Sequence, residues 1–146
     1  MRVLVLQGPN LNLVGTREPH IYGSTTLDEI HAMIREHAAS LGVEVETYQS
    51  NHEGDLIDRL HRRDFDAAIV NAAGLTHTSV SLRDALLAVE RPFVEVHLSD
   101  PAKREAFRSV NFLQDVAVAS FVGMGPRGYL LALDEIVRRD YTGGAR

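Results

Sequence analysis

The amino-acid sequence predicts an α/β fold, with a doubly wound parallel sheet of five strands and helices on both faces. Short runs rich in Val, Ile and Ala recur along the chain, and each is followed by a segment in which apolar residues have helical spacing. Strands that helices cover on both faces have such near-continuous apolar runs. The 146 residues are enough for one domain, so we expect a single domain over residues 1–146 with a frayed tail at residues 140–146.

Each expected strand is followed by an expected helix. The strands are predicted at residues 2–6, 43–48, 67–72, 92–98 and 116–123, and the helices at residues 27–41, 55–63, 80–90, 101–108 and 126–139. The first helix has a capping box formed by Thr26 and Glu29, and Gly42 is expected to end it. The second strand alternates between apolar and polar side chains, and the second helix turns Leu56 and Leu60 inward.

Composition excludes several classes of function. The chain has no Cys, which removes disulfides, thiol nucleophiles and Cys-bound metals and favours a cytoplasmic location. The N-terminus has only four consecutive apolar residues, too few for a signal peptide or a membrane span. The net charge of −5, without a basic stripe, disfavours nucleic acid and anionic membranes as partners. Lys103 is the single lysine and hence the one candidate for Schiff-base chemistry.

Polar side chains follow the expected strands at the points where those strands end. Asn10, Asn51, Asn71 and His97 each come at or just after the end of a strand. Ligands of open α/β sheets bind beyond the carboxyl ends of the strands, so we expect these side chains to gather at one rim.

The segment NAAGLTHTS, residues 71–79, has two interpretations. Thr78 or Ser79 can cap the helix that follows, with His77 in solvent. The same helix N-terminus can also hold a carboxylate or a phosphate. A nucleophile pair of Ser79 and His77 is disfavoured, because residues two apart in a turn need not face each other.

Glu95 and His97 share one face of an otherwise apolar strand. A carboxylate beside an imidazole orients the ring and stabilises its protonated form, which suits a general acid. The alternative is an edge strand with one polar face. Arg104 and Arg108, four apart on the expected helix, either face solvent or turn toward the rim to hold an anion.

The opening loop, residues 8–23, is long for a compact domain, and such loops are often binding loops or lids. It contains Arg17 and Tyr22, and the alternative is a plain surface loop. The pKa of a phenol in water is about 10. Tyr22 could therefore act as a base near neutrality only with guanidinium charge beside it.

Five segments in this order resemble the type II 3-dehydroquinate dehydratases: GPNLNLVGTREPHIYG, NAAGLTHTSVSLRDAL, VEVHLS, REAFR and GYLLAL. The resemblance runs from Val3 to about Leu133. It implies a flavodoxin-like fold and a hydro-lyase of the shikimate pathway. That enzyme removes water from 3-dehydroquinate by anti-elimination through an enolate, giving 3-dehydroshikimate without a metal or cofactor.

The resemblance also implies the catalytic roles. Tyr22 would be the base, with Arg17 on the same loop and Arg108 lowering its pKa. Asn10 would hold a water at the enolate oxygen, and His97, paired with Glu95, would protonate the departing hydroxyl. The implied substrate-binding residues are Asn71, His77, Asp84, Leu98, Ser99 and Arg108.

Family members are usually dodecamers built from trimers, and Asp84 matches a residue that reaches a neighbouring subunit's site. Two segments depart from the usual family pattern: Ala72-Ala73, where many relatives have Gly or Pro, and SVNFLQ, residues 109–114. The substrate contacts of the backbone and the trimer packing near Asn111 are the features that these departures affect.

Three rival interpretations stay open at the level of sequence. A flavin-binding electron carrier would have a loop rich in Ser, Thr and Gly after the first strand, where this chain has Gly-Pro-Asn-Leu. A phosphoacceptor receiver domain would have Asp where Asn71 stands. An inactive paralogue of the dehydratase is the third.

Overall fold

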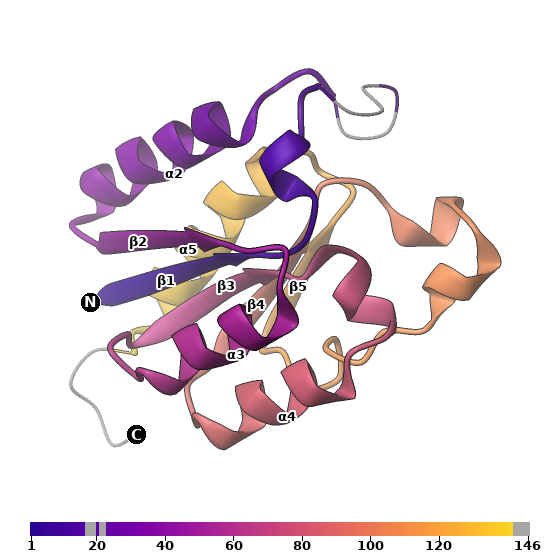
Figure 1. The fold of residues 1–146 in the computed structure, drawn as a ribbon. Coiled ribbons are helices and arrows are strands. Elements are labelled where there is room, and N and C mark those ends of the chain that lie inside the picture. Colours follow the sequence, from indigo (N-terminus) through magenta and orange to yellow (C-terminus); the bar gives the residue numbers. More distant parts are fainter. Residues whose placement is uncertain (17–19, 21–22, 142–146) are drawn as a thin grey trace.

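The computed structural model describes residues 1–16, 20 and 23–141 and has a five-stranded parallel sheet at its centre (Figure 1). The strands are β1 (Arg2–Gln7), β2 (Glu44–Gln49), β3 (Ala67–Asn71), β4 (Phe93–His97) and β5 (Ala119–Val122). Their order in the sheet is β2-β1-β3-β4-β5, and every pair is parallel. This is the order of the flavodoxin-like folds, so the predicted fold class is confirmed.

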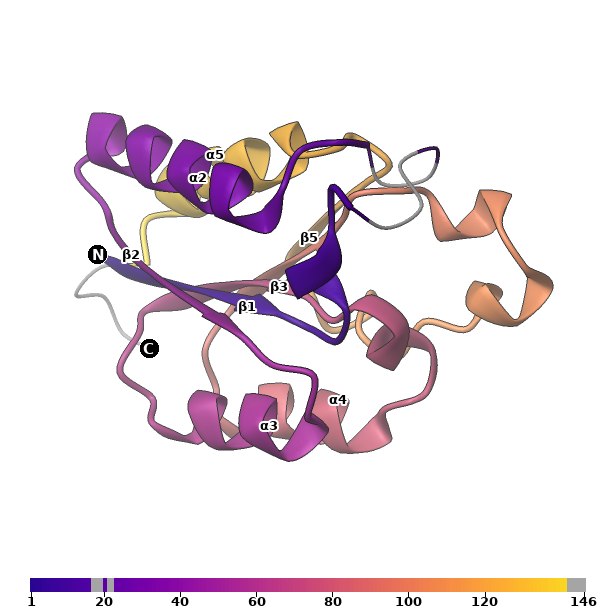
Figure 2. The ribbon, with the colours of Figure 1, turned by 45° about the horizontal axis from the view of Figure 1, so that its top comes forward.

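Within the described residues, four α-helices cover the two faces of the sheet. They are α2 (Leu27–Leu41), α3 (Glu53–His61), α4 (Val80–Ala88) and α5 (Arg127–Arg139). Helices α2 and α5 lie on one face, and α3 and α4 lie on the other (Figures 1 and 2). In the part of the chain that the structure describes, no helix has the length and apolar character to cross a bilayer. The expected frayed tail falls mostly outside the described residues.

Alternation along the central strands divides the core in two. Val3 and Val5 of β1 pack into the core beneath α2 and α5, and Leu4 and Leu6 pack into the core above α3 and α4. All four side chains are at most 1% exposed. Because both faces of β1 are buried, its sequence is a continuous apolar run.

Helix α2 begins as the sequence predicts. Thr26 Oγ1 accepts a hydrogen bond from the Glu29 N–H at 3.2 Å, and the Thr26 N–H donates to Glu29 Oε1 at 3.3 Å. These reciprocal bonds satisfy two N–H groups that the first turn of a helix leaves free. Gly42 ends the helix with a φ of 71°, in the left-handed region that glycine adopts without strain.

The helix predicted at residues 101–108 is wrong. The structure has two 3-10 turns there, Pro101–Lys103 and Ala106–Ser109. The backbone of Arg104 is extended between them, so the first turn cannot continue into an α-helix. The Asp100 carboxylate accepts from the Ala102 N–H at 3.0 Å and caps the first turn instead.

The opening loop also contains regular structure that the sequence did not indicate. Leu11–Leu13 forms a 3-10 turn, and Leu11 and Val14 are buried in the core beneath α2. The loop is joined to the sheet where β1 ends, because the Gly8 N–H donates to the Asn71 carbonyl at 2.8 Å. From β1 the chain passes to β2 on one side and later to β3 on the other, so a crevice is expected at this rim.

Replacement of Gly8 tests how closely β1 and β3 must approach there. A Cβ at Gly8 would lie 2.6 Å from the carbonyl carbon of Ala72 and still closer to its oxygen, and both atoms are backbone. Gly8→Ala should therefore lower the free energy of unfolding by roughly 1–3 kcal/mol, measured by urea denaturation.

The matched control is Gly54→Ala in α3, where an added Cβ meets nothing within 4 Å. This helical substitution should stabilise the protein by up to about 1 kcal/mol. Equal unfolding free energies for Gly8→Ala and the wild type would contradict the close approach.

Candidate active site

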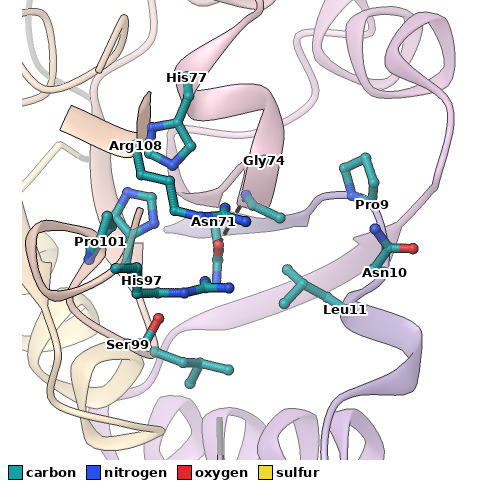
Figure 3. Close-up of a pocket in the computed structure, with 13 residues that line it drawn as sticks. Pro9, Asn10, Leu11, Asn71, Gly74, His77, His97, Ser99, Pro101 and Arg108 are labelled. Carbon is teal, nitrogen blue, oxygen red and sulfur yellow. Dashed lines mark hydrogen bonds between the residues drawn. The ribbon is translucent and has the colours of Figure 1, made fainter. Parts of the chain in front are cut away.

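A pocket lies at the carboxyl ends of β1, β3 and β4, where the strand order changes direction. Its walls come from the opening loop, the segment after β3 and the two 3-10 turns after β4 (Figure 3). The lining residues are Pro9, Asn10, Leu11, Asn71, Ala73, Gly74, His77, His97, Leu98, Ser99, Pro101, Arg104 and Arg108. The predicted gathering of polar side chains at one rim is confirmed for the residues in this set.

Glu95 stands behind His97 and holds the ring in place. Its side chain is fully buried, and Oε2 lies 2.8 Å from His97 Nε2. Oε2 also accepts from Asn111 Nδ2 at 2.7 Å, and Oε1 accepts from Ser120 Oγ at 2.9 Å. Burial alone would raise the pKa of this carboxyl, but the hydrogen bond and charge of His97, with the bonds from Asn111 and Ser120, outweigh it and lower the pKa.

The ionised Glu95 determines which ring nitrogen of His97 is protonated and donates to the carboxylate. A carboxylate only accepts, so His97 Nε2 is the donor in this bond. Nδ1 is then the ring atom that can exchange a proton with a molecule in the pocket, which His97 lines. The alternative of an edge strand with a solvated polar face does not hold, because β4 lies between β3 and β5 and both side chains are buried.

Asn111 and Ser120 were not identified from the sequence as parts of this site. In the sequence, Asn111 stands out only as part of residues 109–114, which depart from the family pattern near a trimer contact. The structure places the side-chain amide of Asn111 against Glu95. Its Oδ1 also accepts from the N–H groups of Leu113 and Gln114, at 2.8 and 2.9 Å. No local pattern could have indicated these partners, because Glu95 is 16 residues from Asn111 and 25 from Ser120.

Asn71 lines the pocket from the end of β3 and is held from behind. Its Nδ2 donates to Tyr129 Oη at 2.9 Å, and its Oδ1 accepts from the Ala73 N–H at 3.2 Å. Tyr129 in turn donates to Gln7 Oε1 at 2.7 Å. Burial raises the pKa of Tyr129 to about 12, despite its bonds to Asn71 and Gln7, so the side chain is a neutral phenol. A weak signal for Gln7 exists in the sequence, because it is a polar residue at the end of an apolar strand.

The arginines after β4 both line the pocket, although no helix carries them. Their side chains are 15% (Arg104) and 19% (Arg108) exposed, so the interpretation as a solvated surface is wrong. Arg108 Nε donates to Glu105 Oε1 at 2.8 Å, and this bond is the main cause that lowers the pKa of Glu105. A guanidinium has five N–H donors in a planar fork, a geometry that suits an anionic or hydroxylated ligand.

The opening loop and the segment after β3 complete the walls. Asn10 has a left-handed backbone, with a φ of 70°, and its N–H donates to Asn51 Oδ1 at 2.9 Å. His77 Nδ1 lies 2.6 Å from the Val110 carbonyl, which can only accept, so Nδ1 is the donor and Nε2 is left for the pocket.

Ser79 caps α4 rather than acting with His77. Its Oγ accepts from the Leu82 N–H at 2.9 Å and donates to Glu53 Oε2. The predicted capping of α4 by Ser79 is confirmed, but the expectation that His77 faces solvent is wrong, because His77 bonds to the Val110 carbonyl and lines the pocket. Among the described residues, no group of three or more His, Asp or Glu side chains is placed to hold a metal ion.

The predicted site residues therefore fall into four groups. Those that line the pocket are Asn10, Asn71, His77, His97, Leu98, Ser99 and Arg108. Glu95 contacts His97 from behind, and Asp84 is exposed on α4 away from the pocket. Arg17 and Tyr22 lie outside the described residues. The chemical role of each residue stays a prediction.

Known proteins resemble this chain over most of its length. Residues 1–137 match the family described as Dehydroquinase class II. A protein of Fusarium vanettenii named catabolic 3-dehydroquinase 1 is 53% identical over 138 residues, which cover 93% of this chain and 96% of that protein. A protein of Ralstonia nicotianae named 3-dehydroquinate dehydratase 1 is 54% identical over 138 residues, 92% of this chain and 88% of that protein.

A solved structure agrees with the sequence matches. The crystal structure of type II dehydroquinase from Butyrivibrio crossotus superposes with a TM-score of 0.91 at 40% identity. The match covers 93% of this chain and 97% of that one.

Proposed function

The chain belongs to the class II dehydroquinase family and dehydrates 3-dehydroquinate to 3-dehydroshikimate, and we propose which residues carry out the steps. The observation that carries the proposal is the buried Glu95 carboxylate bonded to His97 at the wall of the pocket. Elimination beside a ketone needs a base, an acid and a group that stabilises the oxyanion. His97 is the acid, and it gives its proton from Nδ1 to the departing hydroxyl.

Tyr22 is the proposed base, and it removes the proton alpha to the ketone. The resemblance of residues 8–23 to the family motif supports this role, with Arg17 on the same loop and Arg108 in the pocket to favour the phenolate. An anti-elimination needs the base and the acid on opposite faces of the substrate. The loop residues Pro9 and Asn10 lie across the pocket from His97, which supports that arrangement (Figure 3).

The remaining residues are proposed to hold the substrate. Asn10 binds the water that stabilises the enolate oxygen. The N–H groups of Leu98 and Ser99, directly after β4, bind the carboxylate. Asn71, His77 and Arg108 bind the hydroxyl groups, and the position of each side chain at the pocket supports this role.

The alternatives are not favoured. A flavin-binding module or an inactive paralogue would have no need for a buried carboxylate that orients a histidine at the wall of a polar pocket. A role in the shikimate pathway and aromatic amino acid biosynthesis stays a prediction, since relatives named catabolic and relatives without that name are equally similar. A cytoplasmic location also stays a prediction from composition.

We propose that the enzyme is a homododecamer, a tetramer of trimers, in which Asp84 reaches the site of a neighbouring subunit. Exposed apolar side chains support an interface on this side of the molecule: Val80 is 51% exposed and Leu87 is 49% exposed on α4, the helix that carries Asp84.

Sedimentation of the purified enzyme should give the mass of twelve chains.

Asp84→Ala should lower kcat/KM by about tenfold, the effect of a lost hydrogen bond to a charged group, although Asp84 lies outside the pocket of its own chain. A fully active single chain would contradict the proposal.

Replacement of His97 tests the proposed acid. His97→Ala should lower kcat for 3-dehydroquinate by about 10²–10⁴-fold, the usual contribution of a general acid. The readout is the growing ultraviolet absorbance of the conjugated enone of 3-dehydroshikimate. Borohydride treatment beforehand should leave the wild-type rate unchanged, because no lysine imine takes part.

The control is His61→Ala, an exposed histidine in the last turn of α3, which should have the wild-type rate. A rate for His97→Ala near that of the control would show that the pair of Glu95 and His97 is structural.

A further inference from the structure

A chain of polar side chains runs from the pocket into the core beneath α2 and α5. It joins Asn71 of β3 to Tyr129 of α5 (2.9 Å), Tyr129 to Gln7 of β1 (2.7 Å), and Gln7 Nε2 to His31 Nε2 of α2 (3.3 Å). Gln7 and Tyr129 are fully buried, and His31, at 8%, is the most exposed of the four. Buried polar groups of this kind need every partner to be correctly oriented.

The donors and acceptors of this hydrogen-bonded network allow one orientation of the Asn71 amide. The Ala73 N–H can only donate, so the oxygen of the Asn71 amide must face it. Tyr129 has a single proton, which it donates to Gln7 Oε1, so its oxygen is free to accept from Asn71 Nδ2. Both contacts therefore require the same orientation of the amide.

The hydrogen bonds at the His31 end of this network run in the same direction. Because Gln7 Oε1 accepts from Tyr129, Gln7 Nε2 faces His31 and donates to it. His31 Nε2 must then be the unprotonated nitrogen of a neutral ring. Burial, followed by the nearby Arg35, lowers the pKa of His31 against the opposing charge of Asp28, which agrees with a neutral ring.

We propose that Tyr129, Gln7 and His31 are positioning residues of the reaction, which fix the amide of Asn71 so that it presents one defined donor and one defined acceptor to the substrate. The inference rests on the proposed function in one respect, namely that Asn71 binds substrate. With two bonds made inside the protein, one Nδ2 hydrogen and one lone pair of Oδ1 remain for the pocket. If the amide were flipped, the donor Nδ2 and the acceptor Oδ1 would exchange places. A hydroxyl of the substrate would then face a donor where it needs an acceptor, or an acceptor where it needs a donor.

Removal of the Tyr129 hydroxyl separates this role from simple packing. Tyr129→Phe keeps the ring in the core and deletes the atom that orients Asn71. We expect KM for 3-dehydroquinate to rise about three- to tenfold, the worth of one misoriented hydrogen bond, with kcat changed less than about twofold. In an Asn71→Ala background, Tyr129→Phe should not raise KM further, because the residue through which it acts is gone.

The matched control is Tyr48→Phe, which removes a phenol oxygen from β2 away from the pocket and should leave KM unchanged. Near-ultraviolet circular dichroism and thermal melting establish that each variant is folded. If Tyr129→Phe does not fold, Gln7→Met gives the same test, because it removes the acceptor that sets the direction of the Tyr129 hydroxyl.

The outcomes separate the two proposals. An unchanged KM for Tyr129→Phe, or an equal rise in KM in both backgrounds, overturns the positioning role if Asn71→Ala itself raises KM. If Asn71→Ala leaves KM unchanged, the assignment of Asn71 to the substrate is wrong, and the positioning role is overturned with it.

Discussion

The ionised carboxylate of Glu95, buried in the sheet, is the interaction on which the rest of the site depends. A buried charge without partners costs several kcal/mol, so the fold must supply donors to it. The donors come from three parts of the chain: His97 from β4 itself, Ser120 from β5, and Asn111 from the segment between them. The Glu95 carboxylate therefore holds three parts of the site together: the ring of His97, strand β5 through Ser120, and the segment around Asn111.

The sheet separates this network from a second one. Along each central strand, alternate side chains face opposite layers, and Val94 and Val96 of β4 belong to the core beneath α2 and α5. Glu95 and His97 therefore face the layer of α3 and α4. Tyr129 lies in the core beneath α2 and α5, and its hydroxyl bonds to Gln7 and Asn71. The two networks come together at the rim, where His97 and Asn71 line the same pocket (Figure 3).

Local sequence rules predicted the parts of the fold and site that depend on local physics. The five strands, the capping box of α2 and the shared face of Glu95 and His97 follow from periodicity and spacing, and the structure confirms them. The helix expected at residues 101–108 does not form, because the backbone of Arg104 is extended between the two 3-10 turns. Arg104 and Arg108 both line the pocket although no α-helix carries them.

The supporting residues could not be found in the same way. Tyr129 is 122 residues from Gln7 and 58 from Asn71, and in the sequence it is one more apolar position on an amphipathic helix. Asn111 likewise lies in an irregular segment, 16 residues from the Glu95 carboxylate that it contacts. Such partners depend on topology, which a single sequence does not specify residue by residue.

The most direct test of this account is the titration of Glu95 by NMR of protein labelled with ¹³C at the glutamate carboxyl carbons, with the Glu95 signal assigned by its loss in Glu95→Gln. The pKa of Glu95 is lowered in the folded state, so its ionisation stabilises the fold above the ordinary value of 4.5, and that stability is lost as the pH falls through the folded-state pKa. The account predicts a midpoint below 4.5. A midpoint above 4.5 would mean that burial prevails over the three donors, and it would contradict the claim that a fixed negative charge orients His97.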